Sequence, residues 1–301
     1  MGTPDYATII LDKIVKDPQY EVIALFTQED KKVGRKQLLT PPHIKQYALD
    51  NNLDFPIYQP SKLREEQNVE IIKGLNPDFI IVAAYGQILP ESILNIAPCI
   101  NLHASLLPLY RGASPIQEAL LNDDSFTGVA SMLMDVGLDT GDILGLKYLK
   151  LDKDMCVEEA FAKLSQIAAD LTIETLENFE QIIPKKQNDT NATHCGKISK
   201  DDGLVDFTSA YKLYNKYRAY HYWPGIFLEN GLKIKTAKLR DKCSHNRVGE
   251  ILEIKNDSIL LGCEKGTLEI FEVQAPSKKQ VNIIDYLNGN RLNKGDLLHW
   301  N

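Results

Sequence analysis

The fold is decided by two apolar runs and by the polar residues that follow the second of them. The first run reads Phe79-Ile80-Ile81-Val82-Ala83-Ala84-Tyr85-Gly86, and the second, Pro98-Cys99-Ile100, leads directly into Asn101-Leu102-His103-Ala104-Ser105. A short apolar run between turn residues is typical of a strand buried on both faces of a parallel sheet. The polar residues therefore lie at the carboxyl end of a strand, which is where ligands bind in open α/β sheets.

Alternation along this strand places three polar side chains on one side of it. In an extended chain Asn101, His103 and Ser105 point one way, while the intervening Leu102 and Ala104 point the other way. One face is thus expected to carry an amide, an imidazole and a hydroxyl together.

A second polar cluster follows, Asp135-Val136-Gly137-Leu138-Asp139-Thr140-Gly141-Asp142, with three carboxylates within eight residues. Its glycines permit sharp bends. Taken singly, an Asn or His near a strand end usually satisfies backbone groups, and an Asp between glycines is usually a turn residue. Residue types alone therefore leave structural and functional roles both open.

The composition is that of an ordinary globular protein of two domains. The chain has 301 residues, 44% of them hydrophobic and 25% charged, and no stretch approaches the roughly 18 apolar residues of a membrane span. The five cysteines are scattered and never form a CxxC pair. This pattern favours a reducing cytoplasm over a disulfide framework or a zinc site.

The charge is distributed unevenly along the chain. Residues 1–189 contain 17 Lys and Arg against 28 Asp and Glu, whereas residues 190–301 contain 17 against 13. A mildly basic tail permits contact with a polyanion, although ordinary compositional variation explains the difference equally well.

Strands alternate with helices up to about residue 182, which indicates βαβ units and an α/β fold with a mostly parallel sheet. The segment 183–197 is polar without periodicity and is interpreted as a linker. Beyond it, a helix over about 209–220 precedes several short, closely spaced strands, which are typical of a small β-barrel. The charged segment 28–39 is interpreted as a solvated loop.

Several ordered motifs closely resemble the 10-formyltetrahydrofolate-dependent formyltransferases. The likeness covers nearly the whole chain and rests on Met1–Ala7, Asn101-x-His103-x-Ser105-Leu106-Leu107-Pro108, Tyr110-Arg111-Gly112, Pro115-Ile116, Thr127-Gly128-Val129, Met134–Asp142, Trp223-Pro224-Gly225 and Gly249-Glu250-Ile251. The resemblance implies a Rossmann-like catalytic domain over 1–182 and an OB-like tRNA-binding domain over 198–301.

The resemblance also implies which residues carry the reaction. Formyl transfer to an amine is acyl transfer through a tetrahedral intermediate, which requires an oxyanion stabiliser and a group that moves protons. Asn101 offers a neutral N–H donor, His103 titrates near neutrality, and Asp139 can orient the imidazole. Asn101, His103 and Asp139 are therefore expected to be catalytic, and no metal is expected.

Further positions are carried over from the family as expected binding residues. The folate co-substrate, 10-formyltetrahydrofolate, is expected at Ser105, Leu106, Leu107, Pro108, Tyr85, Gln87 and Leu89. The acceptor is expected to meet Gly2, Thr3 and Pro4, with Arg35 and Lys36 reaching the acceptor stem of a tRNA. Arg111 is left open between binding an anion and pinning its own loop.

The expected acceptor is methionyl initiator tRNA, and the protein is expected to act as a cytoplasmic monomer without a membrane. The alternatives are an amino sugar nucleotide or another small amine as acceptor, a hydrolase that releases formate, and a tRNA-binding protein without catalysis. The family places a short apolar strand just before the Gly-Thr-Pro loop, which leads to the hypothesis that translation starts upstream of Met1.

Overall fold

The computed structural model describes residues 1–34 and 36–298, which form two compact units. The first unit comprises residues 1–115, 126–150 and 161–195, and the second comprises 116–125, 151–160 and the chain from Gly196 onward. The predicted class is confirmed, because the first unit is a Rossmann-like α/β domain and the second is built on an antiparallel sheet.

The strands of the first unit place β6 (Cys99–His103) at the centre of a buried sheet. This strand pairs in parallel with β5 (Ile80–Val82) and antiparallel with β8 (Phe126–Leu133), which in turn pairs antiparallel with β9 (Ile143–Lys150). A separate parallel pair joins β1 (Leu25–Phe26) to β4 (Ile57–Tyr58). All five residues of β6 are buried, as the apolar run predicts.

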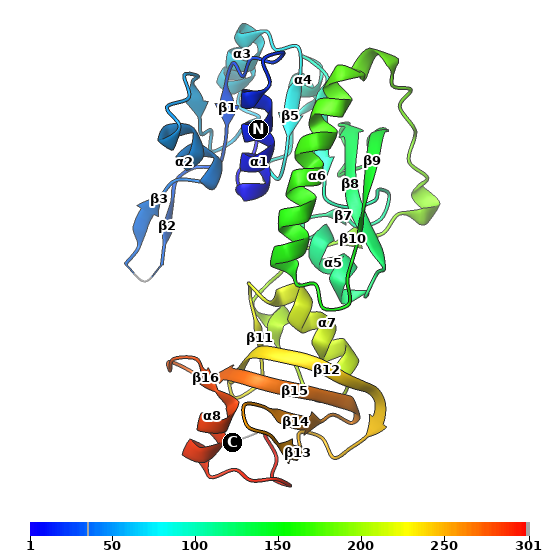
Figure 1. Ribbon diagram of the computed structural model, residues 1–301. Coiled ribbons are helices and arrows are strands. Elements are labelled where there is room, and N and C mark those ends of the chain that lie inside the picture. Colours follow the sequence, from blue (N-terminus) through cyan, green and yellow to red (C-terminus); the bar gives the residue numbers. More distant parts are fainter. Residues whose placement is uncertain (35, 299–301) are drawn as a thin grey trace. The chain divides into compact units, whose positions relative to one another are not determined.

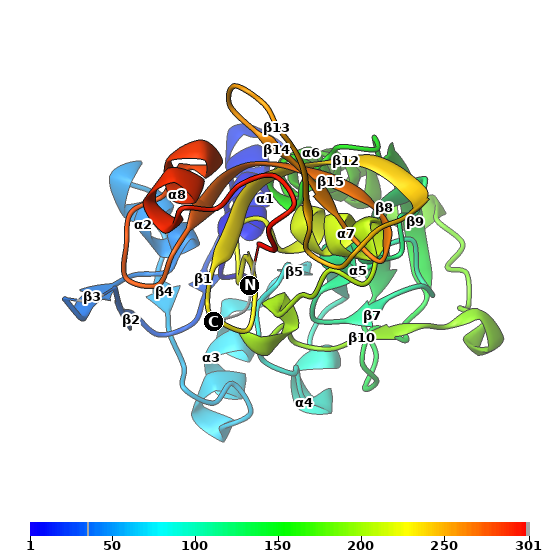
Figure 2. The same cartoon turned by 90° about the horizontal axis from the view of Figure 1, so that it is seen from below.

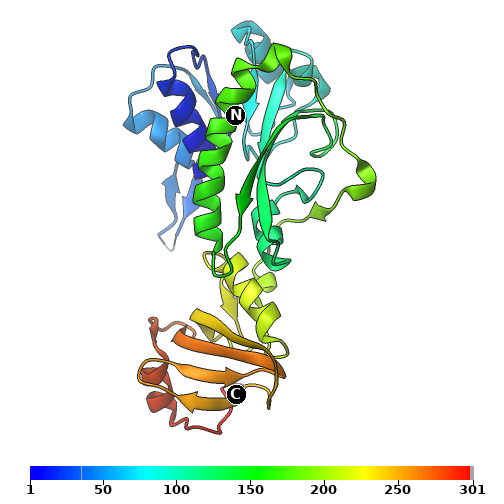
Figure 3. The same cartoon turned by 45° about the vertical axis from the view of Figure 1, so that its right-hand side comes forward.

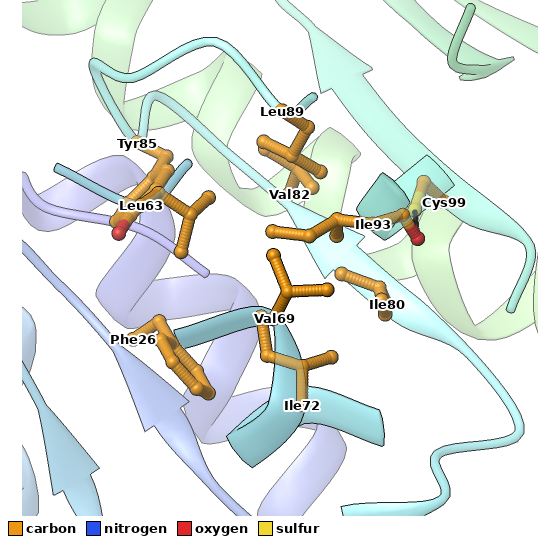
Figure 4. Packing of buried hydrophobic residues seen from close by; sticks show 10 residues of the cluster. All are labelled: Phe26, Leu63, Val69, Ile72, Ile80, Val82, Tyr85, Leu89, Ile93 and Cys99. Carbon is orange, nitrogen blue, oxygen red and sulfur yellow. Dashed lines mark hydrogen bonds between the residues drawn. The ribbon is translucent and has the colours of Figure 1, made fainter. Parts of the chain in front are cut away.

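Helices pack against this sheet and fill its core. They are α1 (Asp5–Lys16), α2 (His43–Asp50), α3 (Glu66–Leu75), α4 (Glu91–Leu94) and α6 (Val157–Glu177), with a 3₁₀ turn, η1, at Phe179–Gln181. Helix α5 (Pro115–Leu121) belongs to the second unit from Ile116 onward. Figure 3 shows α6 lying along β8 and β9, where the hydroxyl of Thr175 donates to that of Ser131 at 3.0 Å. Figure 4 shows the apolar cluster between α3 and β5, in which Val69 and Ile72 face Ile80 and Val82.

Met1 and Gly2 lie between β1 and β5 and join the two parallel pairs. The Met1 ammonium donates to the Ile81 carbonyl at 2.6 Å, the Ala83 amide donates to the Met1 carbonyl, and the Gly2 amide donates to Phe26. A cavity of about 760 Å³ lies beside Met1, and it is lined largely by apolar side chains that include Ile10, Ile14, Phe79 and Phe179.

The first apolar run is a shorter strand than the sequence predicts. Phe79–Gly86 is expected to be one strand, but its pairing with β6 is limited to Ile80–Val82, and both Ala84 and Gly86 have positive φ. β1 is only two residues long, and residues 21–24 before it line the cavity instead of forming a strand.

The segment predicted as a solvated loop contains a β-hairpin. Strands β2 (Lys31–Val33) and β3 (Leu38–Thr40) pair antiparallel, with Val33 opposite Leu38, and extend away from the helices of the first unit in Figure 1. The loop prediction is therefore wrong for these residues. A three-residue strand with all side chains exposed has no hydrophobic alternation, so only the pairing reveals it.

The segment predicted as a linker is hydrogen-bonded to the first unit over much of its length. Lys185 exchanges both backbone hydrogen bonds with Ile143 at 2.8 and 2.9 Å, and a 3₁₀ turn, η2, follows at Asp189–Asn191. Strand β10 (His194–Cys195) then pairs in parallel with β7 (Arg111–Gly112). The domain bounds stay a prediction, but this stretch is anchored beside the candidate site.

Among its described residues, the second unit contains an antiparallel sheet of six strands, which helices accompany (Figures 1 and 2). The strand order is β11-β12-β15-β14-β13, and β16 pairs with β15. Register shifts interrupt the long β12–β15 pairing, as expected of strongly twisted strands. The elements are η3 (Asp201–Gly203), α7 (Ala210–Tyr220), β11 (Ile226–Phe227), β12 (Lys233–His245), β13 (Ile251–Ile254), β14 (Ile259–Gly262), β15 (Lys265–Gln274), β16 (Val281–Asn282) and α8 (Ile283–Asn290).

Candidate active site

Strand β6 brings Asn101 and His103 to one side of the sheet. Both side chains are buried, with 9% and 6% of their surface exposed, and they alternate with the fully buried Ile100 and Leu102. Strands β5 and β8 flank β6 on its two edges, so the local backbone is fixed by ladders on both sides. The predicted alternation is confirmed for Asn101 and His103. It does not extend to Ser105, because β6 ends at His103 and the Ser105 amide donates to the His103 carbonyl at 2.9 Å.

Asp139 reaches these two side chains from the loop between β8 and β9. The Asp135 carboxylate shapes this loop by accepting from the Gly137 amide at 2.9 Å and from the Thr140 hydroxyl at 2.7 Å. The Asn101 amide nitrogen donates to Asp139 Oδ1 at 3.3 Å, and His103 Nδ1 lies 3.7 Å from Asp139 Oδ2. The three side chains therefore converge, as the geometric expectation required.

The hydrogen bonds of His103 define which ring nitrogen faces the carboxylate. Nε2 lies 2.9 Å from the Tyr110 carbonyl oxygen. Because a carbonyl oxygen only accepts, Nε2 carries a hydrogen, and Nδ1 is the nitrogen turned toward Asp139.

Asp139 Oδ2 also accepts from the Gly112 amide at 2.8 Å. Gly112 has a φ of +122°, and a Cβ atom built on it would lie 2.1 Å from the Cys195 carbonyl oxygen. Only glycine therefore allows β7 and β10 to approach each other at this point.

Arg111 pins its own loop, which decides between the two roles left open by the sequence. Its side chain is buried. It donates to the side-chain oxygen of Gln187, Oε1, from Nε at 3.1 Å and from a terminal nitrogen at 2.9 Å. The same terminal nitrogen lies 2.7 Å from Asp189. Gln187 is not predicted as a site residue from the sequence, because a single amide in a polar stretch without periodicity gives no indication of a buried contact.

The expected folate residues divide between two neighbouring stretches of the first unit. The Ser105 hydroxyl donates to the Leu109 carbonyl, and Leu107 packs with Ala130 and Met132. The two remaining positions of that stretch, Leu106 and Pro108, adjoin them in sequence.

The second stretch holds Tyr85, Gln87 and Leu89 near the core cluster. Gln87 accepts from the Leu63 amide and donates to the Pro60 carbonyl, both at 2.8 Å. The Tyr85 hydroxyl is buried with no hydrogen-bond partner among the described residues, and burial raises its pKa to about 12. Figure 4 shows Tyr85 and Leu89 on the same side of the cluster as Leu63.

The expected acceptor-binding residues occupy different environments. Gly2 is buried between β1 and β5, the Thr3 hydroxyl donates to the Tyr85 carbonyl at 3.0 Å, and Pro4 precedes α1. These three positions therefore lie next to the second folate stretch. Lys36 is exposed in the hairpin turn, while Arg35 lies outside the described residues.

Neither a metal cluster nor a membrane-spanning helix is present within residues 1–34 and 36–298. These residues contain no group of three or more His, Cys, Asp or Glu side chains arranged to hold a metal ion. They also contain no helix with both the length and the apolar character needed to cross a membrane.

Family models match almost the entire chain. The model described as formyl transferase matches residues 1–189, and the one described as formyl transferase, C-terminal domain, matches residues 197–291. The chain therefore belongs to the formyl transferase family.

Curated relatives that are similar over nearly the full length of the chain are methionyl-tRNA formyltransferases. The chain is 53% identical over 296 residues to methionyl-tRNA formyltransferase of a Nitratiruptor species, covering 98% of this chain and 97% of the relative. It is 52% identical over 298 residues to methionyl-tRNA formyltransferase of Sulfurimonas denitrificans, covering 99% and 98%.

Solved structures show the same fold at low identity. An N-formyltransferase from Helicobacter canadensis, in complex with folinic acid and dTDP-3-aminofucose, has a TM-score of 0.67 at 16% identity and covers 91% of this chain and 97% of its own. HypX from Aquifex aeolicus, in complex with tetrahydrofolic acid, has a TM-score of 0.61 at 15% identity and covers 93% and 49%.

Replacing Gly112 should destabilise the site loop. Gly112→Ala places a methyl group against the Cys195 backbone at a positive φ, and we expect a loss of more than about 2 kcal/mol in the free energy of unfolding. Urea unfolding measures this loss. Gly196→Ala is the matched control, because a Cβ atom at Gly196 meets nothing within 4 Å. Equal stability of the two variants would refute the close-approach explanation.

Proposed function

We propose that this chain transfers the formyl group of 10-formyltetrahydrofolate to the free amino group of methionyl initiator tRNA, and so supports translation initiation. The main support is the identity of just over one half, across nearly the full length of both chains, with methionyl-tRNA formyltransferases. The convergence of Asn101, His103 and Asp139 supplies a site for the chemistry.

In the proposed reaction the methionyl nitrogen attacks the formyl carbon and forms a tetrahedral intermediate. The bond from that carbon to N10 of the folate then breaks, the amine loses one proton and N10 gains one. Asn101 stabilises the oxyanion through its amide N–H, a role worth about 3–4 kcal/mol at comparable sites. His103 moves the proton, and Asp139 orients the imidazole.

The folate co-substrate is proposed to lie against the two stretches that follow β5 and β6. Ser105–Pro108 and Tyr85–Leu89 both come from loops at the carboxyl ends of these parallel strands, which is where α/β sheets bind ligands. The site chemistry proposed here draws on side chains and needs no metal.

The β2–β3 hairpin is proposed to contact the tRNA. It carries Lys31, Lys32 and Lys36 together with the exposed apolar side chains of Val33, Leu38 and Leu39, which are 56%, 63% and 67% exposed. Cations suit phosphates, and exposed apolar groups suit bases or ribose faces. Monomeric state and cytoplasmic location stay predictions.

Amino sugar nucleotides remain the second candidate acceptor. They are suggested by the structural likeness to sugar N-formyltransferases, but that likeness is at 16–19% identity and concerns the fold. The relatives above 50% identity carry the methionyl-tRNA name instead. Release of formate to water is the third possibility.

The acceptor is tested by offering methionyl initiator tRNA and amino sugar nucleotides side by side with labelled formyl donor. We expect label in the tRNA and not in the sugar nucleotides. His103→Ala should abolish transfer while tRNA binding is retained, because the imidazole moves a proton and does not hold the tRNA. Label in the sugar nucleotide alone would overturn the proposed function, and unchanged turnover by His103→Ala would overturn the site.

Binding of tRNA should weaken as ionic strength rises, because phosphate contacts release counterions. Lys36→Ala should lower affinity and reduce the slope of log affinity against log salt by about 1. Filter binding at several salt concentrations measures both quantities. Lys73→Ala on α3, whose ammonium already pairs with Glu70, is the matched control. A Lys36→Ala slope equal to that of Lys73→Ala would exclude Lys36 as a phosphate contact.

A further inference from the structure

The buried side chain of Gln187 uses every hydrogen-bonding position that an amide possesses. Its Nε2 donates to the Asp139 carbonyl at 2.8 Å and to the Gly141 carbonyl at 2.7 Å. Its Oε1 accepts twice from the guanidinium of Arg111. Two N–H donors and two lone pairs are the full capacity of the group, so the orientation of the amide is determined without ambiguity.

The carbonyls that Gln187 holds belong to the loop that presents the Asp139 carboxylate. Asp139 has a φ of +55°, a left-handed conformation that is unfavourable for a non-glycine residue and persists only where the surroundings impose it. Gln187 donates to the backbone carbonyl of this residue and to that of Gly141, two residues later. It therefore fixes the turn on both sides of Thr140.

Arg111 and the next residue, Gly112, hold the backbone and the side chain of Asp139, respectively. The Arg111 guanidinium orients the Gln187 amide, which holds the Asp139 carbonyl, and Gly112 donates its backbone N–H to the Asp139 carboxylate. Two adjacent residues of β7 thus fix the backbone and the side chain of the same aspartate. Lys185, paired with Ile143, anchors the segment that delivers Gln187.

We propose that Gln187 is a positioning residue for formyl transfer, acting through Asp139. It keeps the Asp139 carboxylate within reach of Asn101 and His103, and it touches neither substrate. The proposal rests on the catalytic role of Asp139 under the proposed function. Without the two N–H donors, the left-handed turn relaxes and the carboxylate moves away from the imidazole.

Gln187→Glu is the sharpest test, because it keeps the size of the side chain and the acceptor for Arg111. It replaces the two donors with an oxygen that repels the Asp139 and Gly141 carbonyls. We expect kcat for formyl transfer to fall about 10- to 100-fold, the range for residues that orient a catalytic group, while KM for both substrates changes less than twofold. Thr190→Ala is the matched control and should keep wild-type kcat, because Thr190 is an exposed neighbour whose hydroxyl bonds the Asn188 side chain.

A double-mutant cycle separates positioning from general stability. In an Asp139→Asn background, Gln187→Glu should lower kcat by less than twofold further, because the group that it positions is already absent. Thermal unfolding of each variant accompanies the kinetics. If Gln187→Glu does not fold, Gln187→Ala takes its place in the same cycle, since water can enter the space that it leaves.

The outcomes distinguish the two levels of the proposal. If Asp139→Asn alone keeps wild-type turnover, the catalytic role of Asp139 fails, and the role of Gln187 fails with it. If Asp139→Asn loses turnover but Gln187→Glu keeps it, only the positioning role is overturned. A full, multiplicative loss in the double variant, or a change confined to KM, would also overturn it.

Discussion

The position of one carboxylate constrains the rest of the first unit. The Asp139 side chain contacts Asn101 and lies close to His103, although Asp139 belongs to a loop and they belong to a strand. Its backbone has a left-handed conformation that is unfavourable for a residue other than glycine. Local sequence cannot impose such a conformation, because the cost of a left-handed residue is repaid only by contacts from elsewhere. Those contacts come from Gly112, 27 residues before it, and from Gln187, 48 residues after it.

This requirement explains why so much polar structure is buried beside the sheet. Arg111 and Gln187 are both nearly inaccessible, and a buried guanidinium without partners would cost several kcal/mol. Their mutual hydrogen bonds, together with Asp189, satisfy the charge and the amide. A network with every member satisfied is rigid, and rigidity of the supporting residues is what holds a catalytic group in place.

Sequence reasoning recovered the features that depend on local pattern. The buried strand β6 and the alternation of Asn101 and His103 follow from the apolar pattern, and the structure contains both. It failed where pairing decides the outcome. The strands of the exposed β2–β3 hairpin lack hydrophobic alternation, and the segment around Gln187 is anchored by partners distant in sequence, so both stretches looked like loop or linker.

The same reasoning explains why the second unit draws on two short segments from earlier in the chain. Residues 116–125 and 151–160 belong to it, although a boundary placed by composition falls only near residue 183. Arg218, 2% exposed on α7, lies 2.6 Å from Asp123 and also donates to the Leu120 carbonyl, and Tyr214 donates to Asp154. A buried arginine must keep its carboxylate, so the unit is complete only with the segment that carries Asp123. Composition shows where the chain becomes polar and loses its periodicity, whereas the partners of buried polar groups show which segments belong to one compact unit.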